Sequence, residues 1–539
     1  MLSKDKYFGT LSEDELWRRY CGFLDLSIDE FMNIQYELLM DEIERVSKSL
    51  LGKKIMNNKK PQNVDEFRQL VPLTTHDDYE PYLSEHNEDA LAIKPYAWCH
   101  SAGRGGRFKW IPQSSEFLER AAKNFLASFI IASTREKGRV NLSPGFRFLP
   151  ILAPPPYASG VLLRALAETV PFKAVPPLET METMEFQARM EKAFQMALKC
   201  GVDVIGALGS VLVKVGEGFE EGRRKSKFSL SMLNLQIMLR LLRAIWRSKR
   251  EKRPVLPKDL WPAKAIVTGG VDTSIYKQDI DRYWGSEPYE FYVCAEGCVV
   301  AAQTWARKGM VFLPDAVFIE FIPYEPRVEE RENRPNEADT LLLNELEAGK
   351  SYEVVITQLY GMPLLRCRMK DVIKVIALTD EETGVNLPHF MFQCRIGETI
   401  NLGGLCDLDE KTIWQAITDT GIKCVEWSAK KEYGQNQTFL RLYIELKESR
   451  EADEIGGMIN EQLKKVDTDY RDLDYYLNLQ PIRVTMLSSG TFERYREGKV
   501  KEGADLAHLK PAHMNAPDGI IKRLLELSDA GITSGKTHQ

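Results

Sequence analysis

A glycine-rich stretch, Ser101-Ala-Gly-Arg-Gly-Gly-Arg-Phe-Lys109, precedes Trp110-Ile-Pro112 and carries the chain's clearest chemical signal. Its three glycines, Gly103, Gly105 and Gly106, let backbone N–H groups approach a phosphate closely, and Lys109 supplies a positive charge. The stretch lacks the four-residue spacer and the Gly-Lys-Ser/Thr ending of a Walker loop, and it is not a G-x-G-x-x-G motif. Taken alone, a glycine-rich surface turn beside a lysine explains it equally well.

The composition of the whole chain excludes several classes of protein. The 539 residues are 44% hydrophobic and 28% charged, which is typical of a folded chain with about three domains, or one large and one smaller. A formal net charge of −6 argues against a general nucleic-acid binder. The N-terminus has no apolar segment that would predict a secretory signal, and no run reaches the length of a membrane span. The nine scattered cysteines indicate reduced thiols in a cytoplasmic protein.

The order of apolar segments predicts an α/β protein. The first 60 residues have helical spacing, and Ser27-Ile-Asp-Glu30 has the spacing of a capping box. Short apolar runs then alternate with helix-like segments to about residue 375, which predicts a substantial β-sheet flanked by helices. The predicted strands include Phe148–Ala153, Ala265–Thr268 and Glu353–Thr357.

A second, smaller α/β pattern follows Arg395, and Thr438–Glu445 is predicted to be an alternating strand within it. We therefore expect a large N-terminal domain over residues 1–394 and a smaller, mobile C-terminal domain over 395–539. The hinge is expected near Arg395 and Glu398.

One segment has two interpretations. Residues 230–246 are apolar at helical spacing, and Arg247-Ser-Lys-Arg-Glu-Lys-Arg253 follows them. A basic amphipathic helix can lie on an anionic membrane. A helix that packs its apolar face into the core, with a solvated basic end, is the more common case, and we expect it here.

The order of several motifs resembles the acyl-adenylate-forming superfamily and, within it, the Gretchen Hagen family of acyl acid amido synthetases. The superfamily's phosphate loop reads roughly T-S-G-T-T-G-x-x-K, and four positions of residues 101–109 match it: Ser101, Gly103, Gly106 and Lys109. Ala102, Arg104 and Gly105 depart from it. The flanking stretches Val71–Tyr82 and Leu260–Ile266 also look like the family's approach to the loop and its later strand entry.

Two further motifs extend the resemblance toward the nucleotide. Tyr292-Val-Cys-Ala-Glu-Gly297 is similar to the element Y-x-x-T/S-E-G, which implies that Glu296 helps to hold magnesium on ATP; Ala295 stands where the family has a hydroxyl that contacts the α-phosphate. Leu364–Val375 is similar to L-x-R-Y-R-x-G-D-V-x-x-V, which implies that Asp371 accepts hydrogen bonds from the ribose. Lys370 stands where that motif has glycine. By themselves, Glu296 and Asp371 would each be explained as a turn residue.

The C-terminal motifs complete the order. Gly490-Thr-Phe492 and Gly503–Pro511 resemble the family's closing G-T-F and G-A-x-x-x-Q-x-K-x-P-R, which places Lys510 on the adenylation lysine. His508 replaces the glutamine and His513 the arginine, while Pro511 comes one position early.

The resemblance implies an ATP-dependent ligase that uses ATP and Mg²⁺. Such an enzyme activates a carboxylic acid as acyl-AMP and transfers the acyl group to an amino acid; the acid is expected among Pro154–Ser159, Gly206–Ser210 and Val267–Gly270. Two alternatives stay open. Met362-Pro-Leu-Leu-Arg366 also looks like the phenylacetate–CoA ligase branch, in which coenzyme A is the acceptor. The departures in the loop would also suit a degenerate homologue that only binds a ligand. We expect a monomer or a weak dimer.

Overall fold

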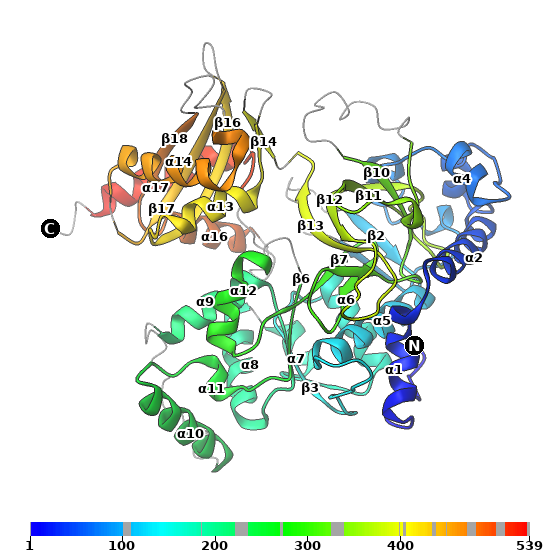
Figure 1. Cartoon of the computed structure of the whole chain (residues 1–539), viewed down its shortest axis with the longest axis horizontal. Helices are drawn as coiled ribbons and strands as arrows, with labels where there is room; N and C mark the ends of the chain where they lie inside the picture. Colours follow the sequence, from blue (N-terminus) through cyan, green and yellow to red (C-terminus); the bar gives the residue numbers. More distant parts are fainter. Residues whose placement is uncertain are drawn as a thin grey trace. The chain divides into compact units, whose positions relative to one another are not determined.

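The computed structural model describes twelve stretches of the chain: residues 2–100, 109–184, 186–220, 235–269, 273–324, 339–397, 399–402, 406–433, 438–448, 450–471, 481–502 and 512–535. The chain folds into two compact units (Figure 1). The first contains nearly all of residues 1–393, and the second contains residues 394–539 together with Lys370–Val372.

The sheet of the first unit is parallel at one end. Strands β4 (Lys173–Ala174), β3 (Arg147–Pro150), β5 (Val204–Gly206), β6 (Ala265–Gly269) and β7 (Tyr289–Cys294) lie side by side in that order, and each pair is parallel. The connections carry helices α6 (Ala158–Thr169), α7 (Leu178–Thr183), α8 (Phe186–Cys200), α9 (Gly209–Glu220), α10 (Leu235–Glu251), α11 (Pro257–Leu260) and α12 (Thr273–Trp284). The predicted strands at Phe148 and Ala265 are therefore confirmed, and so is the α/β class.

The same sheet continues beyond β7 with strands β8 (Cys298–Gln303), β9 (Met310–Phe312), β13 (His389–Arg395), β12 (Cys367–Ala377), β11 (Ser351–Thr357) and β10 (Phe318–Pro323). Here β8 pairs with β9, β9 with β13 and β10 with β11 in antiparallel fashion. The predicted strand at Glu353 is part of β11. Burial of most side chains on these strands explains why they read as continuous apolar runs rather than alternating ones.

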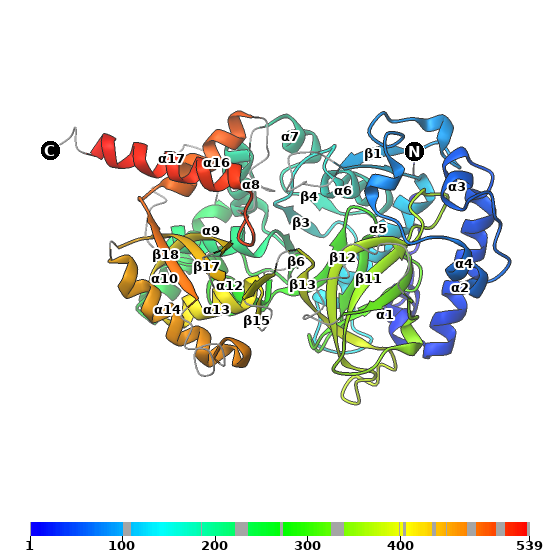
Figure 2. The ribbon, with the colours of Figure 1, turned by 90° about the horizontal axis from the view of Figure 1, so that it is seen from above.

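Helices α1 (Glu13–Cys21), α2 (Ile28–Val46), α3 (Leu50–Ile55) and α4 (Val64–Leu70) precede the hairpin of β1 (Ala97–His100) and β2 (Trp110–Gln113), and α5 (Ser115–Ala132) follows it. Short 3₁₀ helices cover Gly22–Asp25, His76–Tyr79, Glu88–Ala90 and Leu343–Glu345. The predicted capping box at Ser27 is present and begins α2. Helix α2 lies beside α4 in Figure 2. It also packs against β10, where the Gln35 amide donates to the Val317 carbonyl over 2.9 Å and accepts from the Ile319 N–H over 3.0 Å.

Helix α10 corrects the expectation of a core-facing amphipathic helix; residues 230–234 of the predicted segment lie outside the described residues. Only Ile237 and Ala244 are buried, on the side that contacts α8 and α11. Leu241 is partly buried against the same core. Six further large apolar side chains lie on another face and are solvent-exposed: Leu235, Met238, Leu239, Leu242, Ile245 and Trp246. The expectation that this apolar face packs in the core was wrong, because the spacing of apolar residues identifies the face but does not show whether protein or solvent covers it.

The second unit is a smaller α/β fold. Strands β16 (Cys424–Tyr433) and β17 (Thr438–Leu446) pair antiparallel, β18 (Ile482–Leu487) joins β17 in parallel, and β14 (Ile400–Leu402) forms a hairpin with β15 (Cys406–Leu408). Its helices are α13 (Glu410–Asp419), α14 (Ala452–Val466), α16 (Thr491–Lys501) and α17 (Asp518–Gly535). The predicted strand at Thr438 is confirmed as β17.

All nine cysteines are free thiols, and six of them are buried. Among the residues that the structure describes, no helix combines the length and apolarity that a membrane crossing requires.

Candidate functional site

The carboxyl ends of the parallel strands open onto one edge of the sheet in the first unit. After β3, the Ile151 N–H donates to the Gly206 carbonyl over 2.7 Å, and after β5 the Ala207 N–H donates to the Val267 carbonyl over 3.2 Å. In α/β sheets, ligands bind outside the carboxyl ends of the strands. Of the segments expected to hold the acid, Pro154–Ser159 follows β3, Gly206–Ser210 begins at the last residue of β5, and Val267–Gly270 covers the last three residues of β6, so their described parts lie at or beyond the carboxyl ends of these strands.

The hairpin of β1 and β2 frames the glycine-rich stretch. His100 is the register partner of Trp110, so residues 101–109 connect the ends of one strand pair. The candidates Ser101, Gly103, Arg104, Gly105 and Gly106 lie outside the described residues.

The same hairpin contacts the segment that follows β3. The His100 N–H donates to the Pro156 carbonyl over 3.0 Å, and the His100 ring meets Tyr157 at 4.5 Å between centroids. The beginning of the glycine-rich stretch is therefore tied to one of the segments expected to hold the acid.

Glu296 lies on the tight turn between β7 and β8, and two glutamines fix that turn. Gln358 donates from Nε2 to the Glu296 carbonyl over 2.6 Å, and Gln113 donates from Nε2 to the Ala295 carbonyl over 3.4 Å. The Glu296 carboxylate is half-buried and makes no hydrogen bond or ion pair with any residue the structure describes. Its backbone is held while its oxygens stay available for a ligand.

Three buried thiols lie near Glu296, and one of them, Cys367, also lies near Lys109. Burial raises the pKa of Cys367 to about 12; Glu296 raises that pKa further, and Lys109 opposes it. Burial and Glu296 also raise the pKa of Cys298 to about 12 and that of Cys99 well above its usual value. A single buried sulfur can respond to both charges only if both lie near it. Lys109 and Glu296 therefore both lie near the Cys367 thiol.

Tyr292, on β7, and Ala295, on the turn, are the other candidates here; they are buried at 7% and 9% exposure and pack in the hydrophobic core. Their role at the nucleotide stays a prediction.

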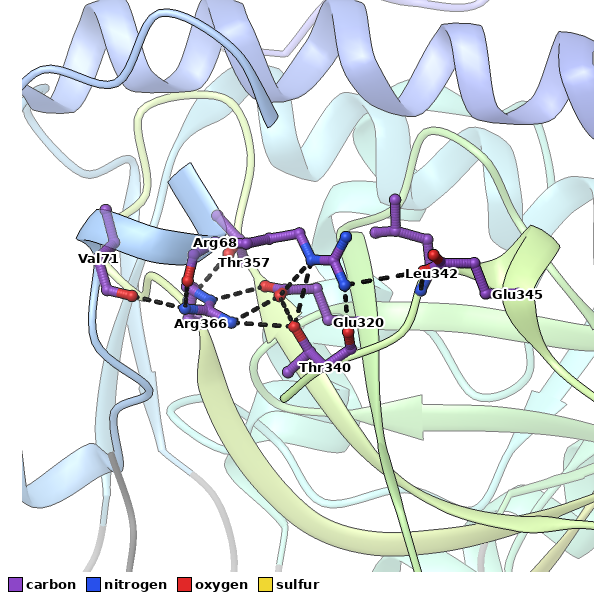
Figure 3. Close-up of polar contacts among 8 residues, drawn as sticks. All are labelled: Arg68, Val71, Glu320, Thr340, Leu342, Glu345, Thr357 and Arg366. Atoms are coloured by element: carbon purple, nitrogen blue, oxygen red, sulfur yellow. Dashed lines mark hydrogen bonds and ion pairs between the residues drawn. The ribbon is translucent and has the colours of Figure 1, made fainter. Parts of the chain in front are cut away.

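Arg366 anchors the entrance to β12, the strand that carries Cys367 and Asp371 (Figure 3). Its guanidinium donates to both Glu320 oxygens, over 3.1 and 2.9 Å, and to the carbonyl of Val71 over 2.6 Å. Its N–H donates to the Thr357 hydroxyl over 2.9 Å. These contacts assign a structural role to the arginine that both family motifs share.

Asp371 lies on β12 in the second unit and is 6% exposed. Its carboxylate faces Arg395, with 3.5 Å between Oδ1 and Nη1. The residue expected at the ribose therefore pairs with a residue expected at the hinge. Glu398, the other hinge candidate, lies outside the described residues.

Lys370 precedes Asp371 and has a φ of +60°, in the left-handed region that favours glycine. Its carbonyl accepts a hydrogen bond from the Ile396 N–H over 2.7 Å. The resemblance places a glycine at this position, and the backbone keeps the glycine-like conformation although a lysine occupies it.

Lys510 lies outside the described residues, which resume at residue 512. The His513 carbonyl accepts from the Ala429 N–H over 2.5 Å, and its ring stacks on Trp427 at 4.4 Å between centroids. Nε2 pairs with Glu426 over 2.8 Å, and Nδ1 pairs with Glu410. Burial lowers the pKa of His513, but the two carboxylates outweigh burial and raise it to about 10. His513 is therefore a cation at neutral pH, as the arginine of the family motif would be.

No sequence motif singled out Gln113, Gln358 or His100. Gln358 directly follows β11, and Gln113 ends β2 just before a helix. A polar side chain at the end of a buried strand is a usable signal, but it does not say which turn the side chain will hold.

Solved structures show which fold the chain shares. The chain is similar to an acyl acid amido synthetase in complex with 2,4-DB (AtGH3.15), with a TM-score of 0.68 and 17% identity over 96% of this chain and 97% of that one. It is also similar to 2-hydroxyisobutyryl-CoA ligase in a postadenylation state, with a TM-score of 0.56 and 13% identity over 96% and 91%. The fold is that of the acyl-adenylate-forming enzymes.

Family comparisons narrow the class. The GH3 family N-terminal domain matches residues 22–168, the central domain 310–395 and the C-terminal domain 411–517. The chain therefore belongs to the GH3 family.

Named relatives agree with this assignment. The chain is 21% identical to jasmonoyl–L-amino acid synthetase GH3.5 of Oryza sativa subsp. japonica, over 93% of this chain and 97% of that protein. It is 28% identical to the GH3 domain-containing protein of Homo sapiens over 199 residues, about a third (35%) of each chain.

Proposed function

We propose that the chain is an ATP-dependent ligase that activates a carboxylic acid as its acyl adenylate and transfers the acyl group to an amino acid, forming an amide. The observation that carries the proposal is that Glu296, whose carboxylate has no partner among the described residues, lies with Lys109 near the buried thiol of Cys367 in a chain with the fold of adenylate-forming enzymes. Membership of a family whose named relatives are amino acid synthetases supports the same reaction.

In the first step, a carboxylate oxygen of the acid attacks the α-phosphorus of ATP, and the bond from that phosphorus to pyrophosphate breaks. The protein contributes position and charge rather than covalent chemistry. Lys109 offsets negative charge on the phosphates, and the backbone N–H groups of the glycine-rich stretch are proposed to bind them. Lys510 is proposed to lie between the acid and the α-phosphate during this step.

The residues present fit a magnesium ion that arrives with ATP. Mg²⁺ usually binds through one or two carboxylates together with substrate phosphates. Within the described part of the chain no cluster of three His, Cys, Asp or Glu side chains could hold a metal by itself. Glu296 supplies carboxylate oxygens, which suits an ion that is shared with the phosphates and neutralises their charge.

In the second step, the amine nitrogen attacks the acyl carbon, the bond to AMP breaks, and the nitrogen loses a proton to solvent or to a base. Lys510 would have to leave before the acceptor could enter, which requires a conformational change. We propose residues 1–394 as the ATP and acid domain, residues 395–539 as the mobile domain, and Arg395 and Glu398 as the hinge. Asp371 is proposed to bind the ribose once Arg395 releases it.

Coenzyme A is the second candidate acceptor, since the ligase similarity at 13% identity supports the shared fold without distinguishing acceptors. A non-catalytic homologue is the third possibility, because Ala102, Arg104 and Ala295 remove hydroxyls that the family motifs carry. A cytoplasmic monomer or weak dimer is proposed from the nine free cysteines and the composition.

Acid-dependent exchange of pyrophosphate into ATP tests the first step directly, using a panel of aryl and aliphatic acids. We expect exchange in the wild type and a loss of about 10²-fold or more in Glu296→Gln and Lys109→Ala, because each removes charge stabilisation made in the transition state. Lys94→Ala, an exposed lysine of the same unit, is the matched control and should leave exchange unchanged. No exchange with any acid, together with no ATP binding by calorimetry, would exclude the enzyme.

The acceptor is tested separately once an acid is found. Amide formation with amino acids, and none with coenzyme A, supports the amido synthetase; thioester formation alone would assign the ligase branch. Lys510→Ala should abolish exchange. If isolated acyl adenylate is still turned over normally by that variant, the lysine serves the first step only.

A further inference from the structure

Helix α10 carries an outward apolar stripe that the proposed reaction does not use. Its six exposed apolar side chains recur at helical intervals and range from 45% to 71% exposed: Leu235, Met238, Leu239, Leu242, Ile245 and Trp246. In a soluble chain, an amphipathic helix normally turns such a stripe toward the core. Figure 1 shows α10 at the periphery of the first unit, where it contacts α8 and α11.

The outward orientation is fixed by polar contacts on the opposite face. Arg240 donates from Nη1 to the carbonyls of Ala197 and Leu198 at the end of α8, over 2.8 and 3.2 Å. Beyond the C-terminal end of α10, Arg253 donates to both oxygens of Asp259 on α11, over 2.7 and 2.9 Å. Asp259 is almost fully buried, so this bidentate pair is a firm anchor. The helix is held against the protein while its stripe faces away.

The charges on α10 indicate what kind of surface its apolar stripe would bind. The helix contains five basic residues, Arg240, Arg243, Arg247, Lys249 and Arg250, against the single acid Glu251. All but Arg240 are exposed, and by helical periodicity Arg243 and Arg250 flank one side of the stripe. The guanidinium of Arg250 lies 5.4 Å from the centre of the Trp246 ring. A tryptophan beside basic residues at the margin of an apolar face is typical of a helix in the interface of a membrane.

We propose that α10 binds the surface of an anionic lipid bilayer, with the six apolar side chains inserted at the level of the acyl boundary and the arginines on the lipid phosphates. A second copy of this chain would offer the stripe a similar apolar face. It would also bring five further cations against one acid, so the electrostatics oppose self-association and favour a surface of opposite charge. The ligase would then work at a membrane surface without crossing it.

Flotation of the full-length protein with vesicles tests the proposal. We expect binding to vesicles of phosphatidylcholine with about 30% phosphatidylserine, little binding to phosphatidylcholine alone, and weaker binding in about 0.5 M salt than in about 0.1 M. Arg243→Gln/Arg250→Gln should weaken binding roughly 10- to 30-fold, since each basic residue contributes about fivefold. Leu242→Asn/Trp246→Asn should weaken it at least about tenfold.

The control is Leu50→Asn, which removes another exposed leucine of the first unit, 55% exposed on α3, and should leave vesicle binding unchanged. All substituted side chains are exposed, so the variants should keep the wild-type Tm. No binding to the anionic vesicles, or undiminished binding by Leu242→Asn/Trp246→Asn, would overturn the proposal. If the wild type is a dimer in sedimentation equilibrium and does not bind vesicles, and if Leu242→Asn/Trp246→Asn dissociates that dimer, the stripe would be assigned to contact with a second copy of the chain instead.

Discussion

Arg366 and Glu320 form a bidentate ion pair inside the first unit, with Nε and Nη2 of the arginine 3.1 and 2.9 Å from the two carboxylate oxygens. Both side chains are at most 5% exposed. The remaining guanidinium donors bond to the carbonyls of Arg68 and Val71, and the Thr340 hydroxyl donates to Glu320 over 2.7 Å. The pair therefore joins α4, β10 and the start of β12, and each charge is matched by its partner.

Breaking this pair on one side should destabilise the first unit strongly. Glu320→Gln leaves the buried arginine without its counter-charge, and we expect the free energy of unfolding to fall by about 3–5 kcal/mol, measured from urea midpoints. Glu382→Gln, which breaks an exposed pair with Lys308, is the control and should cost under about 1 kcal/mol. Equal effects from the two substitutions would contradict the assigned role.

Replacing Lys370 by glycine should stabilise the protein or leave it unchanged. A left-handed backbone costs a non-glycine residue roughly 1–2 kcal/mol, which the greater freedom of glycine in the unfolded chain offsets only in part. Lys374→Gly, at an exposed position of the same strand, should instead destabilise by about 1 kcal/mol. Thermal unfolding of the two variants distinguishes them, and equal losses would refute the argument from φ.

The second unit should lose stability as the pH rises. The pKa of His513 is about 10 in the folded unit, above its ordinary value of 6.5, so the stabilisation by its charge is complete below pH 6.5 and is lost as the pH rises toward 10. His513→Gln should be less stable at about pH 6 and lack this pH dependence. His513→Arg keeps the cation throughout and should also flatten the profile. Urea midpoints from mildly acidic to alkaline pH provide the measurement.

A buried carboxyl should make the first unit sensitive to pH in the neutral range. Burial raises the pKa of Glu42 to about 8, although the Gly361 N–H, which donates over 2.6 Å, opposes the shift. The stability that its proton supplies is full below about pH 4.5 and is lost as the pH rises through 8. Glu42→Gln mimics the protonated group, so it should resemble the wild type at about pH 5 and exceed its stability at about pH 9 by a few kcal/mol. A constant difference across that range would exclude titration of Glu42.

Much of the architecture could be predicted because it rests on local pattern. The strands at Phe148, Ala265, Glu353 and Thr438 are short, strongly apolar or alternating, and the capping box at Ser27 satisfies backbone groups within one turn. Strand order in the large sheet could not be predicted this way, since β13 pairs with β9, a strand far earlier in the chain. Such pairings depend on tertiary packing.

The same distinction between local pattern and tertiary packing applies to the residues of the candidate site. Lys109 and Glu296 could be singled out from the order of motifs, yet only the folded chain brings both of them near one thiol, that of Cys367. Gln113 and Gln358 hold the Glu296 turn from strands that are remote in sequence, so no local pattern predicts them. For helix α10 the helical periodicity was predicted correctly, but the prediction that its apolar face packs in the core was wrong, because most of that face is exposed to solvent.

The anchoring of His513 limits how Lys510 can move. The Ser428 hydroxyl donates to the Ala512 carbonyl, and the Ala516 N–H donates to the Ala429 carbonyl over 3.3 Å, so the chain from residue 512 onward is pinned to β16. Lys510 is two residues away, and two residues span at most about 7 Å. Residue 512 itself is bonded to β16, so we expect the proposed movement of the adenylation lysine to and from ATP to require motion of the second unit as a whole.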